Sequence, residues 1–167
     1  YPSPDEIRSP EMVVDAYMQQ LDAFEKGQLS LDLDVNPELE ALDNPYDRGE
    51  RDKKEITYHW DRAYYNGKYY SYFGLAPLFM VYYPVYWLTG MLPTELLAGS
   101  VLAVFAIFAV FAAIHGLFIT FRPRANLLLF LIGEAAVVSG SFLYLMQASL
   151  SFYYLPLISA VGWLAAF

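Results

Sequence analysis

The stretch Asp61-Arg-Ala-Tyr-Tyr-Asn-Gly-Lys-Tyr-Tyr-Ser-Tyr-Phe-Gly-Leu-Ala-Pro77 joins an acidic, polar part of the chain to an apolar run that continues to Gly90. It surrounds the turn dipeptide Asn66-Gly67 and one cation, Lys68, with tyrosines. Tyrosine and tryptophan favour membrane interfaces because one end of the ring is apolar and the other end needs water. We therefore expect the chain to pass from water into lipid here.

The composition on either side of this stretch differs sharply. Residues 1–70 carry 16 of the 18 acidic residues and 8 of the 10 basic ones, so the formal charge of −8 belongs to this part. The charged residues from 71 to 167 are Glu95, Arg122, Arg124 and Glu134. The acidic balance argues against a nucleic acid as a partner, because nucleic acid would need a basic stripe.

The apolar part contains runs long enough to cross a membrane. A bilayer span needs about 20 mainly apolar residues. Residues 94–121 and 125–146 reach this length, and 152–167 begins a third run that is truncated at the end of the sequence. Because the sequence also begins without methionine, we expect a piece of a longer polytopic chain, whose remaining helices would be partners of this part.

The polar part, residues 1–72, has the patterns of an external loop. Apolar residues recur at three- and four-residue spacings up to Gly27, which predicts an amphipathic helix over about 10–27. Residues 28–35 alternate between polar and apolar side chains, which predicts an extended segment. A helical turn is expected after Asn36-Pro37, and the mixed charges of 48–55 are typical of a solvated loop.

The run 73–90 is expected to lie along the outer membrane surface as a juxtamembrane helix. It is short, it contains Pro77 and Pro84, and it is rich in tyrosine and tryptophan. If this run does not cross, Arg122 and Arg124 follow the span 94–121 on the inner side, as the positive-inside rule requires. These features predict an all-α polytopic membrane protein with an extracytoplasmic first loop.

The same residues, taken together, resemble the first large external loop of the GT-C glycosyltransferases. The resemblance is to the bacterial branch related to protein O-mannosyltransferases and lipid A aminoarabinose transferases. The matching positions are Tyr17, Ala23, Gly27, Asn66-Gly67-Lys68-Tyr69-Tyr70, Pro77, Tyr86-Trp87-Leu88-Thr89, Arg122 and Arg124. The resemblance implies a GT-C-like fold crossing the bacterial cytoplasmic membrane several times.

The chemistry that the resemblance implies is transfer of a sugar from a polyprenyl-phosphate donor to an acceptor hydroxyl at the outer face. A carboxylate near the outer end of the first helix would act as the general base. Asp15 is the first choice for this role and Glu11 is the second. Cations and any divalent metal would hold the leaving phosphate, and no metal ligands are assigned.

The resemblance also implies substrate-binding residues around the turn. Lys68 would approach the donor phosphate. Asp61 would be an acid on the acceptor side or, alternatively, a helix cap. Tyr69 and Tyr70 would stack on sugar rings or the prenyl chain, or would anchor the loop in the headgroup layer.

Two other classes of function remain open. A non-catalytic relative or assembly factor would use the same scaffold to bind lipid or glycan. A transporter component has only Glu134 in its favour, because a carboxylate within an apolar span often marks a pathway. His59 has no second histidine or cysteine nearby that would predict a zinc site.

Overall fold

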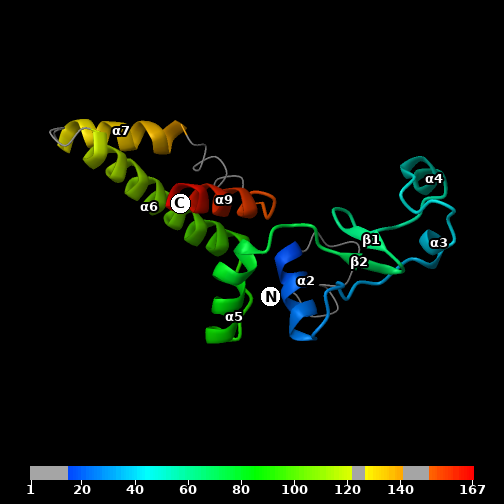
Figure 1. The fold of residues 1–167 in the computed structure, drawn as a ribbon. Helices are drawn as coiled ribbons and strands as arrows, with labels where there is room; N and C mark the ends of the chain where they lie inside the picture. Colours follow the sequence, from blue (N-terminus) through cyan, green and yellow to red (C-terminus); the bar gives the residue numbers. More distant parts are fainter. Residues whose placement is uncertain (1–14, 122–126, 141–150) are drawn as a thin grey trace. The chain divides into compact units, whose positions relative to one another are not determined.

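The computed structural model describes residues 15–121, 127–140 and 151–167. The chain divides into two compact units, Tyr1–Phe73 and Gly74–Phe167. Figure 1 shows the elements of each. The first unit is described from Asp15 onward, so Glu11 and the first part of the helix predicted over about 10–27 lie outside the described residues.

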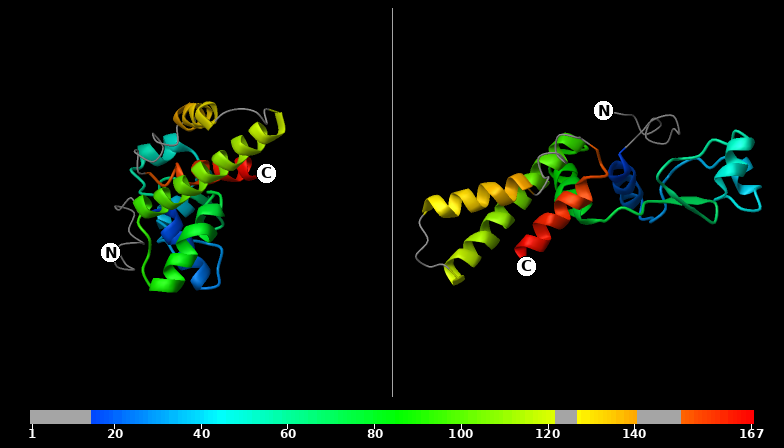
Figure 2. Two further views of the ribbon diagram at one scale, coloured as in Figure 1. Left: turned by 90° about the vertical axis from the view of Figure 1, so that its left-hand side faces the viewer. Right: turned by 90° about the horizontal axis from the view of Figure 1, so that it is seen from above.

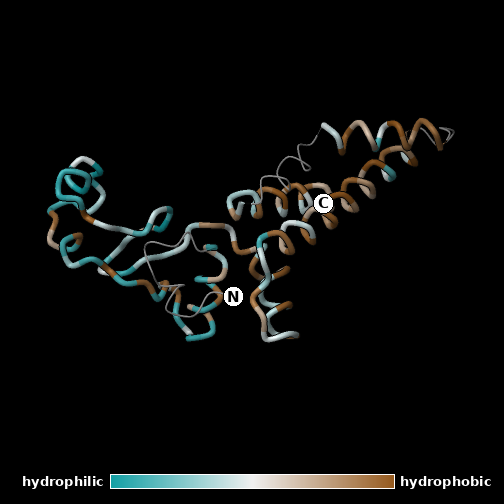
Figure 3. Tube along the Cα trace, turned by 180° about the vertical axis from the view of Figure 1, so that it is seen from behind, coloured by the Kyte–Doolittle hydropathy of each residue, from teal (hydrophilic) through white to brown (hydrophobic). Residues whose placement is uncertain are grey.

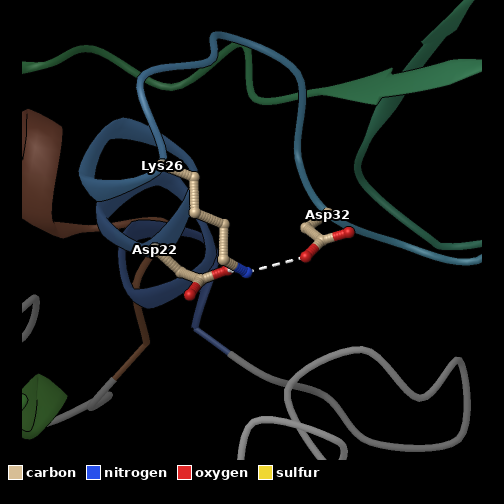
Figure 4. A network of polar contacts seen from close by, with 3 residues as sticks. All are labelled: Asp22, Lys26 and Asp32. Atoms are coloured by element: carbon tan, nitrogen blue, oxygen red, sulfur yellow. Dashed lines mark hydrogen bonds and ion pairs between the residues drawn. The ribbon is translucent and has the colours of Figure 1, made fainter.

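The first helix of unit 1, α2, spans Ala16–Glu25. The carboxylate of Asp15 caps it by accepting a hydrogen bond from the backbone N–H of Tyr17. The helix ends at Gly27, whose φ of 71° only glycine adopts without strain. Lys26, at the same end, pairs with Asp22 and with Asp32 at 2.7 Å each, so it joins the helix to the following segment (Figure 4).

Two short helices follow, and side chains cap both. Asn36 caps α3, Pro37–Glu40, and Asp47 caps α4, Arg48–Lys53. The helical turn expected after Asn36-Pro37 is therefore confirmed. The loop expected over 48–55 is instead mostly helix, because the cap at Asp47 overrides the solvated, charged pattern.

Strands β1, Ala63–Tyr65, and β2, Lys68–Tyr70, form an antiparallel hairpin in which Tyr65 lies opposite Lys68. The two-residue loop is Asn66-Gly67, and both residues have positive φ, 47° and 70°. Such a pair makes the turn whose twist matches the strands. Leu31 extends the pairing, because its N–H donates to the carbonyl of Tyr69 at 2.8 Å.

A small hydrophobic core holds unit 1 together. Its buried members come from the helices, the strand β2 and the segments between them: Ala23 of α2, Leu31, Leu39 of α3, Leu42, Ile56 and Tyr69 of β2. Tyr69 is central to it, with 1% of its surface exposed and its ring in edge contact with Tyr64. The hairpin is therefore attached to the rest of unit 1 through β2.

Unit 2 begins with a wide helical turn, η1, Leu78–Tyr82, which continues into α5, Tyr83–Thr89. The N–H of Tyr83 donates to the carbonyl of Leu78, five residues back. This wider turn suits Pro84, which lacks an N–H and whose ring would crowd the carbonyl four residues before it. Gly90, with φ of 69°, ends α5.

Three apolar helices make up the rest of unit 2: α6, Glu95–Phe121, α7, Leu127–Gly140, and α9, Leu155–Ala166. Figures 1 and 2 show α9 alongside α6, and α7 returning along the far end of α6. Small residues allow the close approach of α9, since a Cβ on Gly162 would collide with the ring of Phe105 and lie 3.2 Å from the Cα of Ala106. Phe130 of α7 packs against Val110 and Ile114 of α6.

Hydrophobic residues dominate these helices, whereas unit 1 is mainly hydrophilic along its loops (Figure 3). Within the described residues, α6 is the one helix that is long and apolar enough to cross a membrane, by length and composition. Its 27 residues correspond to about 40 Å of helix. Large apolar side chains on it stay exposed, including Val104, Phe108 and Leu117.

The predicted fold class, an all-α polytopic GT-C-like membrane protein, was wrong. Unit 1 contains a two-stranded sheet, because the Asn66-Gly67 turn brings two tyrosine-rich segments into register. The run 125–146 and the truncated run 152–167, both predicted as spans, contain the described apolar helices Leu127–Gly140 and Leu155–Ala166, and among the described residues only α6 meets the length of a crossing. In the second run, residues 151–154 form a turn before the helix starts at Leu155, beside Pro156.

Candidate functional site

The strongest concentration of buried polar side chains in the described part of unit 1 lies along the first turns of α2. Asp15 and Gln19 are each only 4% exposed, and Gln19 follows Asp15 by one helical turn. The backbone N–H of Gln19 donates to the carbonyl of Asp15 at 3.3 Å. Buried polar groups are costly unless they are hydrogen-bonded, so this face of α2 requires polar partners.

Arg62 supplies one of these partners from a distant part of the chain. Its Nε donates to Oε1 of Gln19 at 2.6 Å, across 43 positions in the sequence. Its Nη1 donates to the backbone carbonyl of Asp61 at 3.0 Å. These two hydrogen bonds hold the guanidinium group between α2 and the segment just before β1, and they fix the orientation of its plane.

Asp61 has an unusual backbone conformation, with φ of 56°. Non-glycine residues rarely adopt this left-handed conformation, and such strain is concentrated at functional sites and tight turns. Its Oδ1 accepts a hydrogen bond from the hydroxyl of Tyr72 at 3.4 Å. Asp61 caps no helix here; it precedes β1 and turns the chain so that Arg62 reaches Gln19.

We call Asp15, Gln19, Asp61, Arg62 and Tyr72 the α2 cluster. Burial, and secondly the carboxylate of Asp61, raise the pKa of the Tyr72 hydroxyl. Both effects keep the phenol protonated, so it acts as a hydrogen-bond donor. The cluster therefore combines two carboxylates, a fixed guanidinium and a phenol, which is a set able to accept a proton and to bind an anion.

Aromatic rings lie beside the cluster. Tyr17, which follows Asp15, has its ring centroid 6.3 Å from that of Phe73, and Phe73 stacks on Tyr72 at 4.6 Å. Burial, and then the neighbouring Asp15, raise the pKa of Tyr17 strongly. Tyr17 is therefore neutral and belongs to the apolar wall of the site.

The other predicted substrate-binding residues lie on the hairpin. The Tyr69 ring is in the core of unit 1, and its hydroxyl accepts a hydrogen bond from the N–H of His59 at 3.5 Å. Lys68 is exposed and Tyr70 is half-buried. Tyr69 contacts Leu31, His59 and Tyr64, and Lys68 and Tyr70 pair with Tyr65 and Ala63 across the hairpin.

The structure links the segment of Asp61 to α2 through Arg62 and Gln19, two residues that sequence reasoning did not select, and Asp15 stands at the start of the same helix, one turn before Gln19. No local pattern identified them, because the contact joins a helix to a segment 43 positions away. Glu11, the second candidate base, lies outside the described residues. Among described residues there is no group of three His, Cys, Asp or Glu side chains arranged to hold a metal.

Glu134 lies on α7 in the described part of unit 2. Both of its carboxylate oxygens are buried and have no hydrogen-bond partner among the described residues.

Comparisons with protein-family models, with curated proteins and with solved structures found no match for this chain.

Proposed function

We propose that this protein transfers a sugar from a polyprenyl-phosphate donor to an acceptor hydroxyl at the outer surface of a membrane. The observation that carries the proposal is the α2 cluster, in which the contact of Arg62 with Gln19 joins the segment of Asp61 to the helix that Asp15 caps. Sugar transfer from a phosphate needs a base for the acceptor and a cation for the leaving group. The cluster contains both.

In the proposed reaction, Asp15 accepts the proton of the acceptor hydroxyl as its oxygen attacks the anomeric carbon of the sugar. The bond between that carbon and the phosphate oxygen breaks, and polyprenyl phosphate leaves with the bonding electrons. The guanidinium of Arg62 pairs with the phosphate, for which its planar fork is well suited. Asp61 and Tyr72 orient the acceptor through hydrogen bonds.

A lipid-linked donor requires that the enzyme work at a membrane. The length and composition of α6 support this placement, and its exposed apolar side chains would face lipid. The polyprenyl chain would then remain in the bilayer while its phosphate reaches the polar unit.

A second candidate is a non-catalytic protein that binds lipid-linked glycans. It is favoured by one observation: Oδ1 of Asp15 accepts the Tyr17 N–H at 2.8 Å, so the carboxylate already has a structural role as a helix cap. Binding without turnover would distinguish this candidate from the transferase.

The test is sugar transfer in membranes by the full-length chain, with radiolabelled polyprenyl-phosphate sugars, comparing Asp15→Asn with Asp47→Asn. Asparagine caps helices about as well as aspartate, so both variants keep their helices. Only Asp15→Asn removes the proposed base, and we expect turnover to fall about 10²- to 10⁴-fold. Asp47 is the control, because its side chain also caps a helix, α4, but is exposed; it accepts the N–H three positions ahead, whereas Asp15 accepts the N–H two positions ahead.

Three results of this test carry different meanings. Loss of turnover in Asp15→Asn with donor binding retained would support the transferase and its base. Unchanged turnover in Asp15→Asn would remove Asp15 from the mechanism. Binding of the donor by the native chain with no turnover on any acceptor would favour the non-catalytic candidate.

A further inference from the structure

Unit 1 contains a pocket that is separate from the α2 cluster. It has a volume of about 180 Å³, and its lining residues come from two segments that run beside each other: Asp34, Val35, Asn36, Thr57, Tyr58 and His59. The segments are joined where the Nδ2 of Asn36 donates to Oγ1 of Thr57 at 3.1 Å. The pocket is smaller than those that hold drug-sized molecules, which measure roughly 300–1,000 Å³.

His59 is the most informative residue of its wall. Its side chain is only 8% exposed, and its Nε2 is buried without a hydrogen-bond partner among the described residues. Its ring lies in edge contact with Tyr69 at 5.0 Å, which fixes the ring plane. Buried polar atoms are nearly always paired in native proteins, so an orphaned nitrogen at a pocket calls for a partner beyond the described residues, such as a bound ligand.

The character of that partner follows from the protonation of His59. Burial lowers the pKa of the imidazole, and the backbone of Asp34 forms a hydrogen bond with the ring. A neutral imidazole that donates one N–H to a backbone carbonyl has an acceptor at its other nitrogen. Nε2 of His59 is therefore an acceptor, and its partner must be a donor.

The other polar groups of the pocket also favour a ligand with several donors. The carboxylate of Asp34 only accepts hydrogen bonds, and Thr57 both donates and accepts. Arg62 contributes to lowering the pKa of His59, and the guanidinium of Arg51 lies 4.0 Å from the ring of Tyr58. These nearby positive charges count against a cationic ligand and leave neutral hydroxyl groups as the matching donors.

An aromatic surface continues from the pocket. The ring of Trp60 is 5.2 Å from that of Tyr58, a lining residue, and Trp60 is 63% exposed. The guanidinium of Arg48 lies over one face of this indole, 5.7 Å from the ring centroid, and the exposed remainder of the ring offers apolar surface beside polar groups, which suits a molecule with an apolar side and several hydroxyls.

The geometry points to a binding site for a neutral polyhydroxylated ligand the size of a single sugar ring, with His59 and Asp34 accepting from its hydroxyls and with Tyr58 and the exposed part of the Trp60 indole contacting its apolar side. This site is distinct from the proposed transfer site and does not depend on it. It would hold a glycan end or a free monosaccharide.

The experiment measures binding of methyl glycosides of glucose, galactose and mannose to the full-length chain in nanodiscs without glycolipids, by saturation-transfer NMR and calorimetry. The variants are His59→Phe, which keeps a ring against Tyr69 but removes the acceptor, and Asp34→Asn. The matched control is Asp43→Asn, since Asp34 and Asp43 are both exposed acids of unit 1 and Asp43 does not line the pocket.

We expect saturable binding of at least one glycoside, weakened about tenfold or more by His59→Phe and by Asp34→Asn and unchanged by Asp43→Asn. Three results would overturn the inference. The first is that no glycoside binds, in which case a water alone would satisfy Nε2 of His59. The others are that both pocket variants bind like the native chain, or that only ammonium or calcium ions bind.

Discussion

At the scale of single residues, side-chain oxygens start all three described helices of unit 1. Asp15, Asn36 and Asp47 each accept a backbone N–H two or three positions ahead. Helices of four and six residues, such as α3 and α4, are too short to be stable alone, so they depend on these caps and on packing. Asp15 differs from Asp47 in being buried, which capping does not require.

His59 leads to a prediction about pH. Because burial lowers its pKa in the folded chain below the unfolded value of 6.5, the unfolded state binds a proton first as the pH falls. Unit 1 should therefore have its full stability above about pH 6.5 and lose it as the pH falls toward the folded pKa, by up to about 1.4 kcal/mol per pH unit.

The measurement is the free energy of unfolding of unit 1 in the full-length chain between pH 7.5 and 5.5. The charged groups that influence His59 are Asp34, which opposes the lowered pKa, and Arg62, which contributes to it. His59→Phe should flatten the slope in this window. An equal slope in this variant would show that another group is responsible.

At the scale of elements, two features position the hairpin: its turn and the packing of Tyr69 in the core of unit 1. The dipeptide Asn66-Gly67 sets the register of β1 and β2, and Tyr69 anchors β2 in the core. A shift of one residue would exchange the two faces of β2 and move Tyr69 out of the core. The register and the core therefore support each other.

The conformation of Asn66 gives a prediction for this element. Asparagine tolerates the φ of 47° at this position, whereas placing alanine in this left-handed conformation costs roughly 1–2 kcal/mol. Asn66→Ala should therefore destabilise the hairpin by about that amount. Asn66→Gly, which relieves the backbone strain, should remain close to the native stability. Hydrogen exchange of the Tyr69 and Tyr70 amides in the full chain would report the difference. Equal protection in both variants would rule out the left-handed turn as the source of stability.

At the scale of the whole molecule, charge and apolar character are divided between the two units. The charges of the sequence lie mostly before residue 71, and the boundary between the units falls at Phe73 and Gly74. The helix α6 buries a face of small residues against its neighbours while large apolar side chains remain exposed. Exposed apolar surface of this extent is typical of contact with lipid or with other apolar helices.

If α6 crosses a membrane, positions before and after it lie on opposite sides. The chain has no cysteine, so single cysteines at Glu38 and at Phe121 can be labelled without background. In sealed vesicles, we expect a membrane-impermeant maleimide to react with one of them only after the membrane is permeabilised. Cysteine at Asp43, within the same unit as Glu38, is the control and should label with it. Labelling of all three from one side would contradict the crossing.

The sequence by itself determined the local features: the division into polar and apolar parts, the cap at Asn36 and the Asn66-Gly67 turn. These depend on neighbouring residues, whose conformational preferences are local. Only the tertiary structure decided that Leu31 pairs with Tyr69, that Tyr69 belongs to a core and that Arg62 reaches Gln19. Such contacts depend on how distant segments pack, and no periodicity or spacing in the chain encodes them. The sheet that the predicted all-α class missed is a local one, since Asn66-Gly67 joins β1 directly to β2; the turn was identified from the sequence, but the pairing of the tyrosine-rich segments on either side of it was not.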